Sequence, residues 1–261
     1  LCQGIADKVM KNTHFIELRA IGDLNTFNHY IQNYPILKKL TCIACNIKDF
    51  SALKNCKKLV EIQLEETKGS LKGLDLCHSL EKVSLHDSPE LDSIDTLNQL
   101  SKLSHLSIQQ SNISQIDFKM PSLTYFRVYD EKLIDFSFLK DSPKFNTLVI
   151  DEALPNALDN HPTVKGLELI DFTDSILTNI KNCHFLTSLV LKRTSSFYNF
   201  GDSLDLSKLN ECEMLESLSI ENCNVADFSV LKDHGSLKEL HIKNCPNTDT
   251  AKSLKITVVY Y

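Results

Sequence analysis

The sequence contains no tryptophan and few residues that break regular structure. Its 261 residues include only seven glycines and seven prolines, so no Gly-rich or Pro-rich linker divides it. No apolar run approaches the length of about 20 residues that a membrane-spanning helix requires. The chain begins at Leu1 without the basic and apolar regions of a secretory signal. We therefore expect a globular domain that is part of a longer protein and has no membrane partner.

Signatures of common catalytic and nucleotide-binding sites are also missing. The chain has no Gly-x-Ser-x-Gly, His-Glu-x-x-His, phosphate-binding loop or Gly-x-Gly-x-x-Gly pattern. Its formal net charge of −6 argues against a nucleic-acid partner, which favours a basic surface. We expect no enzyme activity, no cofactor and no nucleic-acid partner.

What the sequence does contain is a repeat of about 22 residues. Each copy carries the pattern apolar-x-x-apolar-x-apolar, most clearly in LESLSI at 215–220. This alternation predicts a short strand, in which Leu218 and Ile220 point inward while Ser217 and Ser219 point outward. The pattern begins at Phe15, Leu37, Leu59, Leu80, Leu103, Leu123, Phe145, Val164, Leu186, Leu215 and Leu237.

The second half of the repeat also recurs. It reads CNIKDFSALK at 45–54, LIDFSFLK at 133–140 and CNVADFSVLK at 223–232. We expect Asp49 and Ser51 to accept hydrogen bonds from free backbone N–H groups at the start of a helical turn. Phe50 and Leu53, three residues apart, then face the same interior. One repeat cannot bury its apolar face alone, but stacked copies can, so the pattern predicts a solenoid.

These residues resemble the leucine-rich repeat. The short period and the Asp-Phe-Ser-x-Leu stretch are most similar to internalin-like repeats, whereas the cysteines are similar to those in the repeats of F-box proteins. Internalin-like repeats carry Asn where this chain has Cys45, Ser111, Cys223 and Cys245. The resemblance implies an α/β fold: a curved, right-handed leucine-rich repeat solenoid with a parallel sheet on its concave face. It would form one domain of about ten repeats over residues 1–261.

Eight of the nine cysteines can be assigned to positions of the repeat. Cys45, Cys223 and Cys245 share one position, Cys42 replaces an inward strand residue, and a third position, always Cys-x-x-Leu, holds Cys56, Cys77, Cys183 and Cys212. We expect them to be small buried residues rather than ligands of a metal. Stacked coils lie close enough for disulfides, but burial alone explains the positions, so we favour free thiols and a cytoplasmic or nuclear location.

The outward residues of the strands would form the binding surface of such a solenoid. In the middle of the array they include two tyrosines and an arginine, residue types enriched at protein interfaces. The expected protein-binding residues are Ser84, His86, His105, Ser107, Gln109, Tyr125, Arg127 and Tyr129.

The repeat that begins at Leu186 is the longest, and its extra residues are SSFYNFGDS at 195–203. Phe197, Tyr198 and Phe200 either form a second binding loop or fold down as a plug on the core. From this sequence we expect a non-catalytic scaffold that binds another protein. Two further hypotheses specify the role of this scaffold: it is the substrate-receptor arm of an F-box ubiquitin ligase, or it is an internalin-like surface adhesin.

Overall fold

A computed structural model describes residues 14–19, 24–31, 33–68, 70–91, 93–129, 133, 135–150, 164–172, 176–180, 182–194 and 203–261. The chain divides into two compact units, Leu1–Lys144 and Phe145–Tyr261, and each is described here by itself. In the described residues, no helix is both long enough and apolar enough to cross a membrane.

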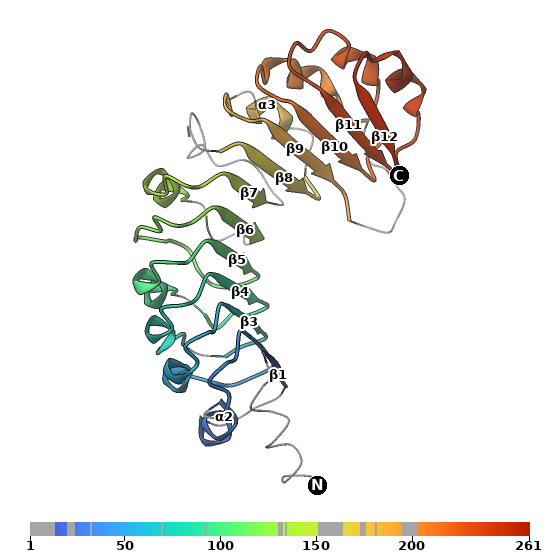
Figure 1. Cartoon of the computed structure of the whole chain (residues 1–261). Coiled ribbons are helices and arrows are strands. Elements are labelled where there is room, and N and C mark those ends of the chain that lie inside the picture. Colours follow the sequence, from blue (N-terminus) through green and yellow to red (C-terminus); the bar gives the residue numbers. More distant parts are fainter. Residues whose placement is uncertain are drawn as a thin grey trace. The chain divides into compact units, whose positions relative to one another are not determined.

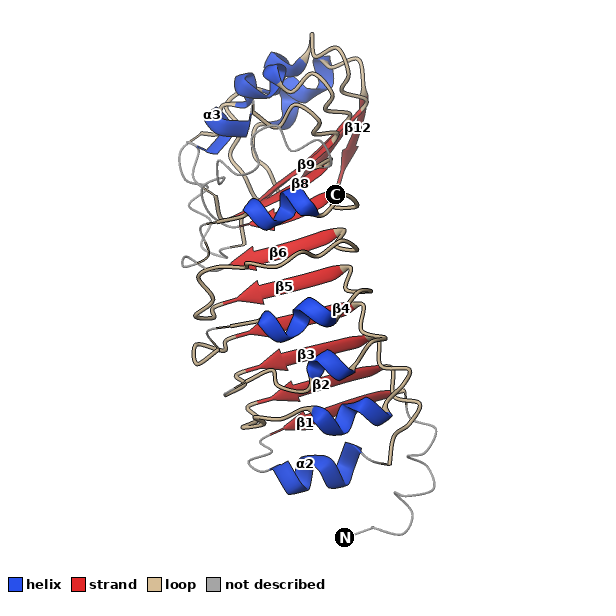
Figure 2. Ribbon diagram, turned by 90° about the vertical axis from the view of Figure 1, so that its left-hand side faces the viewer, coloured by secondary structure: helices blue, strands red, loops and turns tan. Residues whose placement is uncertain are grey.

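The first unit is a stack of parallel strands, each paired with the next along the chain (Figures 1 and 2). The strands are β1 (Phe15–Arg19), β2 (Lys39–Ile43), β3 (Glu61–Glu65), β4 (Lys82–His86), β5 (His105–Gln109) and β6 (Tyr125–Tyr129). Short helices line the other side of this unit (Figure 1). They are α2 (Leu24–Ile31) and the 3-10 helices η1 (Ser51–Asn55), η2 (Leu74–Leu76), η3 (Asp95–Gln99) and η4 (Ser137–Asp141).

The second unit repeats this arrangement. Its parallel strands also pair in chain order. They are β7 (Thr147–Ile150), β8 (Gly166–Ile170), β9 (Ser188–Lys192), β10 (Ser217–Glu221), β11 (Glu239–Lys243) and β12 (Thr257–Tyr260). The helical segments are α3 (Ile176–Ile180), η6 (Leu206–Glu211), η7 (Phe228–Leu231) and η8 (Thr248–Ser253). The predicted α/β solenoid with a parallel sheet is confirmed.

The strand register confirms the repeat pattern from Leu37 onward. Each strand begins two residues after the leading apolar residue, as Lys39 follows Leu37, and the inward residues Leu40 and Cys42 are fully buried. The predicted start at Phe15 is wrong. Phe15 pairs with Lys39 and is 49% exposed, so it is the first residue of its strand rather than the buried residue two positions before the strand. A slip of two residues leaves the alternation of a strand unchanged, and the sequence pattern therefore did not reveal it.

The Asp-Phe-Ser stretch starts a 3-10 turn, as expected for the return half of the repeat. The backbone N–H of Ser51 donates to Asp49 Oδ1 at 2.8 Å, so Asp49 is the acceptor and Ser51 the donor. The expectation that Ser51 also accepts a hydrogen bond stays a prediction. Phe50 and Leu53 are both fully buried, which confirms that they face the same interior.

A left-handed residue follows most strands and turns the chain away from the sheet. Its φ lies between 47° and 55°, a region that costs free energy for residues with a Cβ atom. In the first unit it is Ala44, Glu66, Asp87 and Gln110; in the second it is Asp171, Asn222 and Asn244.

The next residue holds this turn with its side chain. Cys45 Sγ donates to the carbonyl of Ile43 at 3.3 Å, and Ser88 Oγ donates to that of His86 at 2.8 Å. Cys223 makes the equivalent bond in the second unit, 3.2 Å from the carbonyl of Glu221. A thiol and a hydroxyl thus make the same hydrogen bond, which explains why both cysteine and serine occur at this position of the repeat.

Candidate protein-binding surface

The structure brings the predicted strand residues together on one face of the first unit. The register aligns them in three rows across β4, β5 and β6, with Ser84 opposite Ser107 and Ser107 opposite Arg127. Paired strands lie about 4.8 Å apart, so the side chains are neighbours. We call this surface the β4–β6 patch; it comprises Lys82, Ser84, His86, His105, Ser107, Gln109, Tyr125, Arg127 and Tyr129.

Ring contacts hold the large side chains of the β4–β6 patch. His105 and Tyr125 stack with ring centroids 5.5 Å apart and planes inclined by 26°. The Arg127 guanidinium lies over the Tyr129 ring, 5.4 Å from its centroid. Ser104 Oγ is 2.9 Å from His105 Nδ1, and this contact fixes the imidazole further. The side chains of the patch are therefore held in place in the unbound chain, which reduces the entropy cost of binding.

Two polar atoms in the centre of this patch are buried and have no hydrogen-bond partner among the residues that the structure describes. They are Ser107 Oγ and Arg127 Nε, which belong to residues opposite each other in the register. Ser107 as a whole is only 9% exposed. Buried polar groups are normally satisfied, so this pair is a site where an external acceptor would be stabilised.

The two histidines of the patch favour their neutral form. Burial is the main cause that lowers the pKa of His86, and the charge of Arg127 lowers it further. Burial also lowers the pKa of His105, with a further contribution from Lys82. Neutral imidazoles can both donate and accept hydrogen bonds, so at neutral pH these side chains add adaptable polar contacts rather than charge.

The permanent charge of the β4–β6 patch is positive. Its nine residues include Lys82 and Arg127 but no carboxylate. On the adjacent strand β3, Glu61 is paired with Lys39, with Nζ and Oε1 2.6 Å apart, whereas the Glu65 carboxylate lies opposite His86 and partly offsets the lowering of the pKa of that histidine. The equivalent face of the second unit differs, because Glu221 there lies 3.4 Å from Lys192 and 2.7 Å from Lys243.

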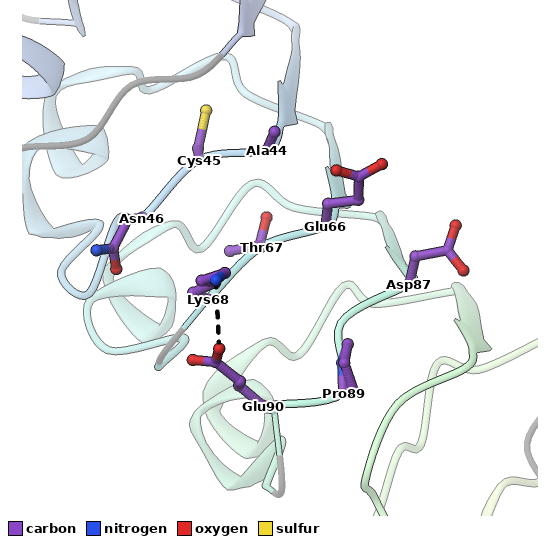
Figure 3. Close-up of a pocket in the computed structure, with 9 residues that line it drawn as sticks. All are labelled: Ala44, Cys45, Asn46, Glu66, Thr67, Lys68, Asp87, Pro89 and Glu90. Carbon is purple, nitrogen blue, oxygen red and sulfur yellow. Dashed lines mark ion pairs between the residues drawn. The ribbon is translucent and has the colours of Figure 1, made fainter.

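A second concave feature lies where strands β2, β3 and β4 end (Figure 3). It is a pocket of about 530 Å³. Glu66 and Asp87 project from the left-handed positions, and Lys68 Nζ lies 3.6 Å from Glu90 Oε1. Other residues that line it are Ala44, Cys45, Asn46, Thr67 and Pro89. Sequence reasoning missed this pocket; the only signal was two acidic residues at equivalent positions of consecutive repeats.

The cysteines of the described chain are free and, except for the half-buried Cys245, buried, which confirms the predicted burial for seven of the eight. Burial raises the pKa of Cys56 to about 11 and is the main cause that raises that of Cys77 to about 12. Such thiols stay protonated and make poor nucleophiles or ligands. Within the described ranges, no group of three His, Cys, Asp or Glu side chains is arranged to hold a metal ion.

His234 occupies the position that cysteine holds in the Cys-x-x-Leu repeats. Its Nδ1 accepts a hydrogen bond from the backbone N–H of Leu237 at 3.2 Å, and its Nε2 lies 3.1 Å from the carbonyl of Leu209. The ring links two neighbouring repeats, so its role is structural. The predicted loop residues Phe197, Tyr198 and Phe200 lie outside the described residues, and both hypotheses for them stay predictions.

Comparisons with known proteins agree with the repeat architecture. No family model matches the chain. A protein of Arabidopsis thaliana that carries the name F-box protein is 27% identical over 180 residues, which covers 64% of this chain and 39% of that protein. The chain therefore spans well under half the length of this relative.

Two solved structures share the fold at low sequence identity. An internalin of Listeria monocytogenes superposes with a TM-score of 0.56 at 16% identity, over 98% of this chain and 84% of the internalin. A chain of the Toll–Spatzle complex of Drosophila superposes with a TM-score of 0.58 at 13% identity, over 94% of this chain and 36% of that chain. The repeat period, the parallel strands in register and these likenesses together identify the fold as a leucine-rich repeat solenoid.

Proposed function

We propose that this chain is a non-catalytic recognition module that binds another protein through the β4–β6 patch. The observation that carries the proposal is the central cluster of Tyr125, Arg127 and Tyr129 on one strand, with a buried Arg127 Nε that has no acceptor in the described part of the chain. Partly buried Tyr and Arg side chains dominate the binding energy of protein interfaces. The Toll–Spatzle structure, which shares the fold, supports this use, because there the fold occurs within a complex.

The test is a double substitution in the β4–β6 patch, Tyr125→Ala with Arg127→Ala. The bait is the chain itself, and the protein that it captures most abundantly is identified by mass spectrometry and then titrated by calorimetry. We expect the double substitution to make the free energy of binding to that partner less favourable by about 2 kcal/mol or more. Surface substitutions of this kind usually leave stability nearly unchanged, so the melting temperature should stay close to that of the wild type.

The control is an outward pair on β10 in the second unit, Ser217→Ala with Ser219→Ala. These residues occupy positions of β10 equivalent to Tyr125 and Arg127 of β6 but present only small hydroxyls, so partner affinity should hardly change. If the β10 pair abolishes binding while the β6 pair preserves it, the binding site lies in the second unit and the proposal is wrong.

A second proposal concerns the setting: the module is the substrate-receptor arm of an F-box ubiquitin ligase. It is supported by the relative from Arabidopsis, although the matched segment is only 39% of that protein.

We further propose a cytoplasmic or nuclear location, supported by the buried free thiols of the described repeats. Co-purification of ubiquitin-ligase subunits with the full-length protein, and its location as a fluorescent fusion, test the two statements separately. The likeness to an internalin is one of fold, so an adhesin role stays a prediction.

A further inference from the structure

The pair Ser107 and Arg127 identifies the kind of group that the β4–β6 patch can receive. Each contributes a buried polar atom, Ser107 Oγ or Arg127 Nε, for which the described residues provide no hydrogen-bond partner. The Nε–H can only donate, and the hydroxyl can donate as well. An incoming group that accepts from both would satisfy the two atoms at once.

The guanidinium is already positioned for such an acceptor. It stacks over the Tyr129 ring at 5.4 Å, and within the described part of the chain no carboxylate forms an ion pair with it. Arginine stacked on a ring keeps its in-plane N–H groups for a planar acceptor, and a carboxylate matches this fork geometry.

Charge favours the same ligand. The chain carries a net charge of −6, yet the nine residues of the patch include two cations and no acid. Lys82 lies at one end of the same face and would attract an anionic segment towards the centre. Arg127 is the only arginine of the patch, whereas phosphate groups are usually held by clusters of arginine. The charge therefore matches a single carboxylate better than a phosphate.

We infer that the β4–β6 patch receives an aspartate or glutamate side chain of the partner protein, whose carboxylate accepts hydrogen bonds from the Arg127 guanidinium and the Ser107 hydroxyl. This inference rests on the proposed function and specifies the chemistry of the partner. The flanking Tyr125 and Tyr129 would contact the apolar stem and the neighbours of that acidic residue.

The arginine side chains allow a direct test by NMR, because the chain has only three: Arg19, Arg127 and Arg193. The probe is the blocked peptide acetyl-Gly-Tyr-Glu-Tyr-Gly-amide, titrated into the ¹⁵N-labelled protein while the three Nε–H signals are observed. We expect the Arg127 signal to move and saturate. Arg19, already paired with Glu17, and Arg193, stacked on Phe172, serve as internal controls that should move little.

Matched peptides and variants complete the design. The same peptide with glutamine in place of glutamate should bind with at least fivefold lower affinity. The Ser107→Ala variant should bind the glutamate peptide with at least threefold lower affinity than the wild type. Equal binding of the two peptides, an unmoved Arg127 signal, or uniform shifts of all three arginines would overturn the inference. A phosphoserine peptide that shifts the Arg127 signal to the same extent at a tenth of the glutamate peptide's concentration would also overturn the inference, in favour of a phosphate ligand.

The two proposals can fail separately. If Tyr125→Ala with Arg127→Ala abolishes partner capture but the glutamate peptide leaves Arg127 unmoved, the patch binds a protein by other chemistry. If partner capture is insensitive to that double substitution while the Arg127 signal moves, the carboxylate site is real but is not where the principal partner binds.

Discussion

The carboxylate of Asp49 accepts the backbone N–H of Ser51 at 2.8 Å and lies 3.1 Å from Lys72 Nζ of the following repeat. One side chain thus starts the 3-10 helix of its own repeat and contacts the next. The hydrogen bonds with Ser51 are the main cause that lowers the pKa of Asp49, and Lys72 lowers it further. Hydrogen bonds with Ser137 and Ser207 likewise lower the pKa of Asp135 and Asp205.

This relationship predicts a loss of stability in acid. A carboxyl whose pKa is lower in the folded state stabilises the fold above its unfolded pKa of about 3.9, and the contribution disappears as pH falls through the folded value. The urea midpoint of the wild type should therefore decrease as pH falls below about 5. In Asp49→Asn, which keeps an acceptor oxygen but no charge, the decrease should be smaller. Asp95→Asn is the control, because the described residues donate no hydrogen bond to the Asp95 carboxylate. A parallel decrease in wild type and Asp49→Asn would contradict the prediction.

Gly73 gives a prediction about the close stacking of repeats. Its φ is +90°, and a Cβ atom there would lie 2.3 Å from the backbone nitrogen of Ser51. Gly73→Ala should reduce the free energy of unfolding by about 2 kcal/mol or more, because both the left-handed backbone and the clash oppose it. Gly235→Ala is the matched control, since a Cβ atom added there would meet no other atom within 4 Å. Chemical denaturation measures both, and equal stability of the two variants would refute the argument.

The turn after each strand predicts that a hydrogen-bonding group matters at Cys223. Serine keeps a donor for the carbonyl of Glu221, as Ser88 does for that of His86, whereas alanine of nearly the same size has none. We expect Cys223→Ala to be less stable than Cys223→Ser by about 1 kcal/mol. Thermal denaturation of the two proteins provides the comparison. If alanine is as stable as serine, the thiol serves only to fill space.

The thiols themselves give a fourth prediction. All nine cysteines should react with a thiol reagent when the protein is denatured without reductant. Among the eight described cysteines, Cys245 should react first in the native protein, because it is half-buried and the other seven are buried. A count of seven under denaturing conditions would reveal a disulfide and contradict the free-thiol prediction.

Sequence alone predicted the features that depend on period. The alternation of LESLSI sufficed to assign Leu218 and Ile220 to the core, and the repeat register sufficed to place Ser107 beside Arg127. It could not predict the features that depend on individual contacts. Neither the stacking of Arg127 on Tyr129 nor the absence of an acceptor for its Nε among the described residues follows from spacing. The pocket beside Glu66 and Asp87 was missed because left-handed turns usually show Gly or Asn, and here they do not.

The left-handed residues after the strands also indicate where substitutions could raise the stability of this protein. In the second unit, Asn222 and Asn244 adopt this conformation with one amide donating to the other at 3.2 Å, which forms the beginning of an asparagine ladder. In the first unit, Ala44, Glu66 and Gln110 adopt it with side chains for which it costs on the order of 1 kcal/mol each. Asparagine at these positions could form a similar ladder within the first unit and should raise its thermal stability, without changing any residue of the β4–β6 patch. Substitutions at these positions are therefore a source of added stability for natural or laboratory selection.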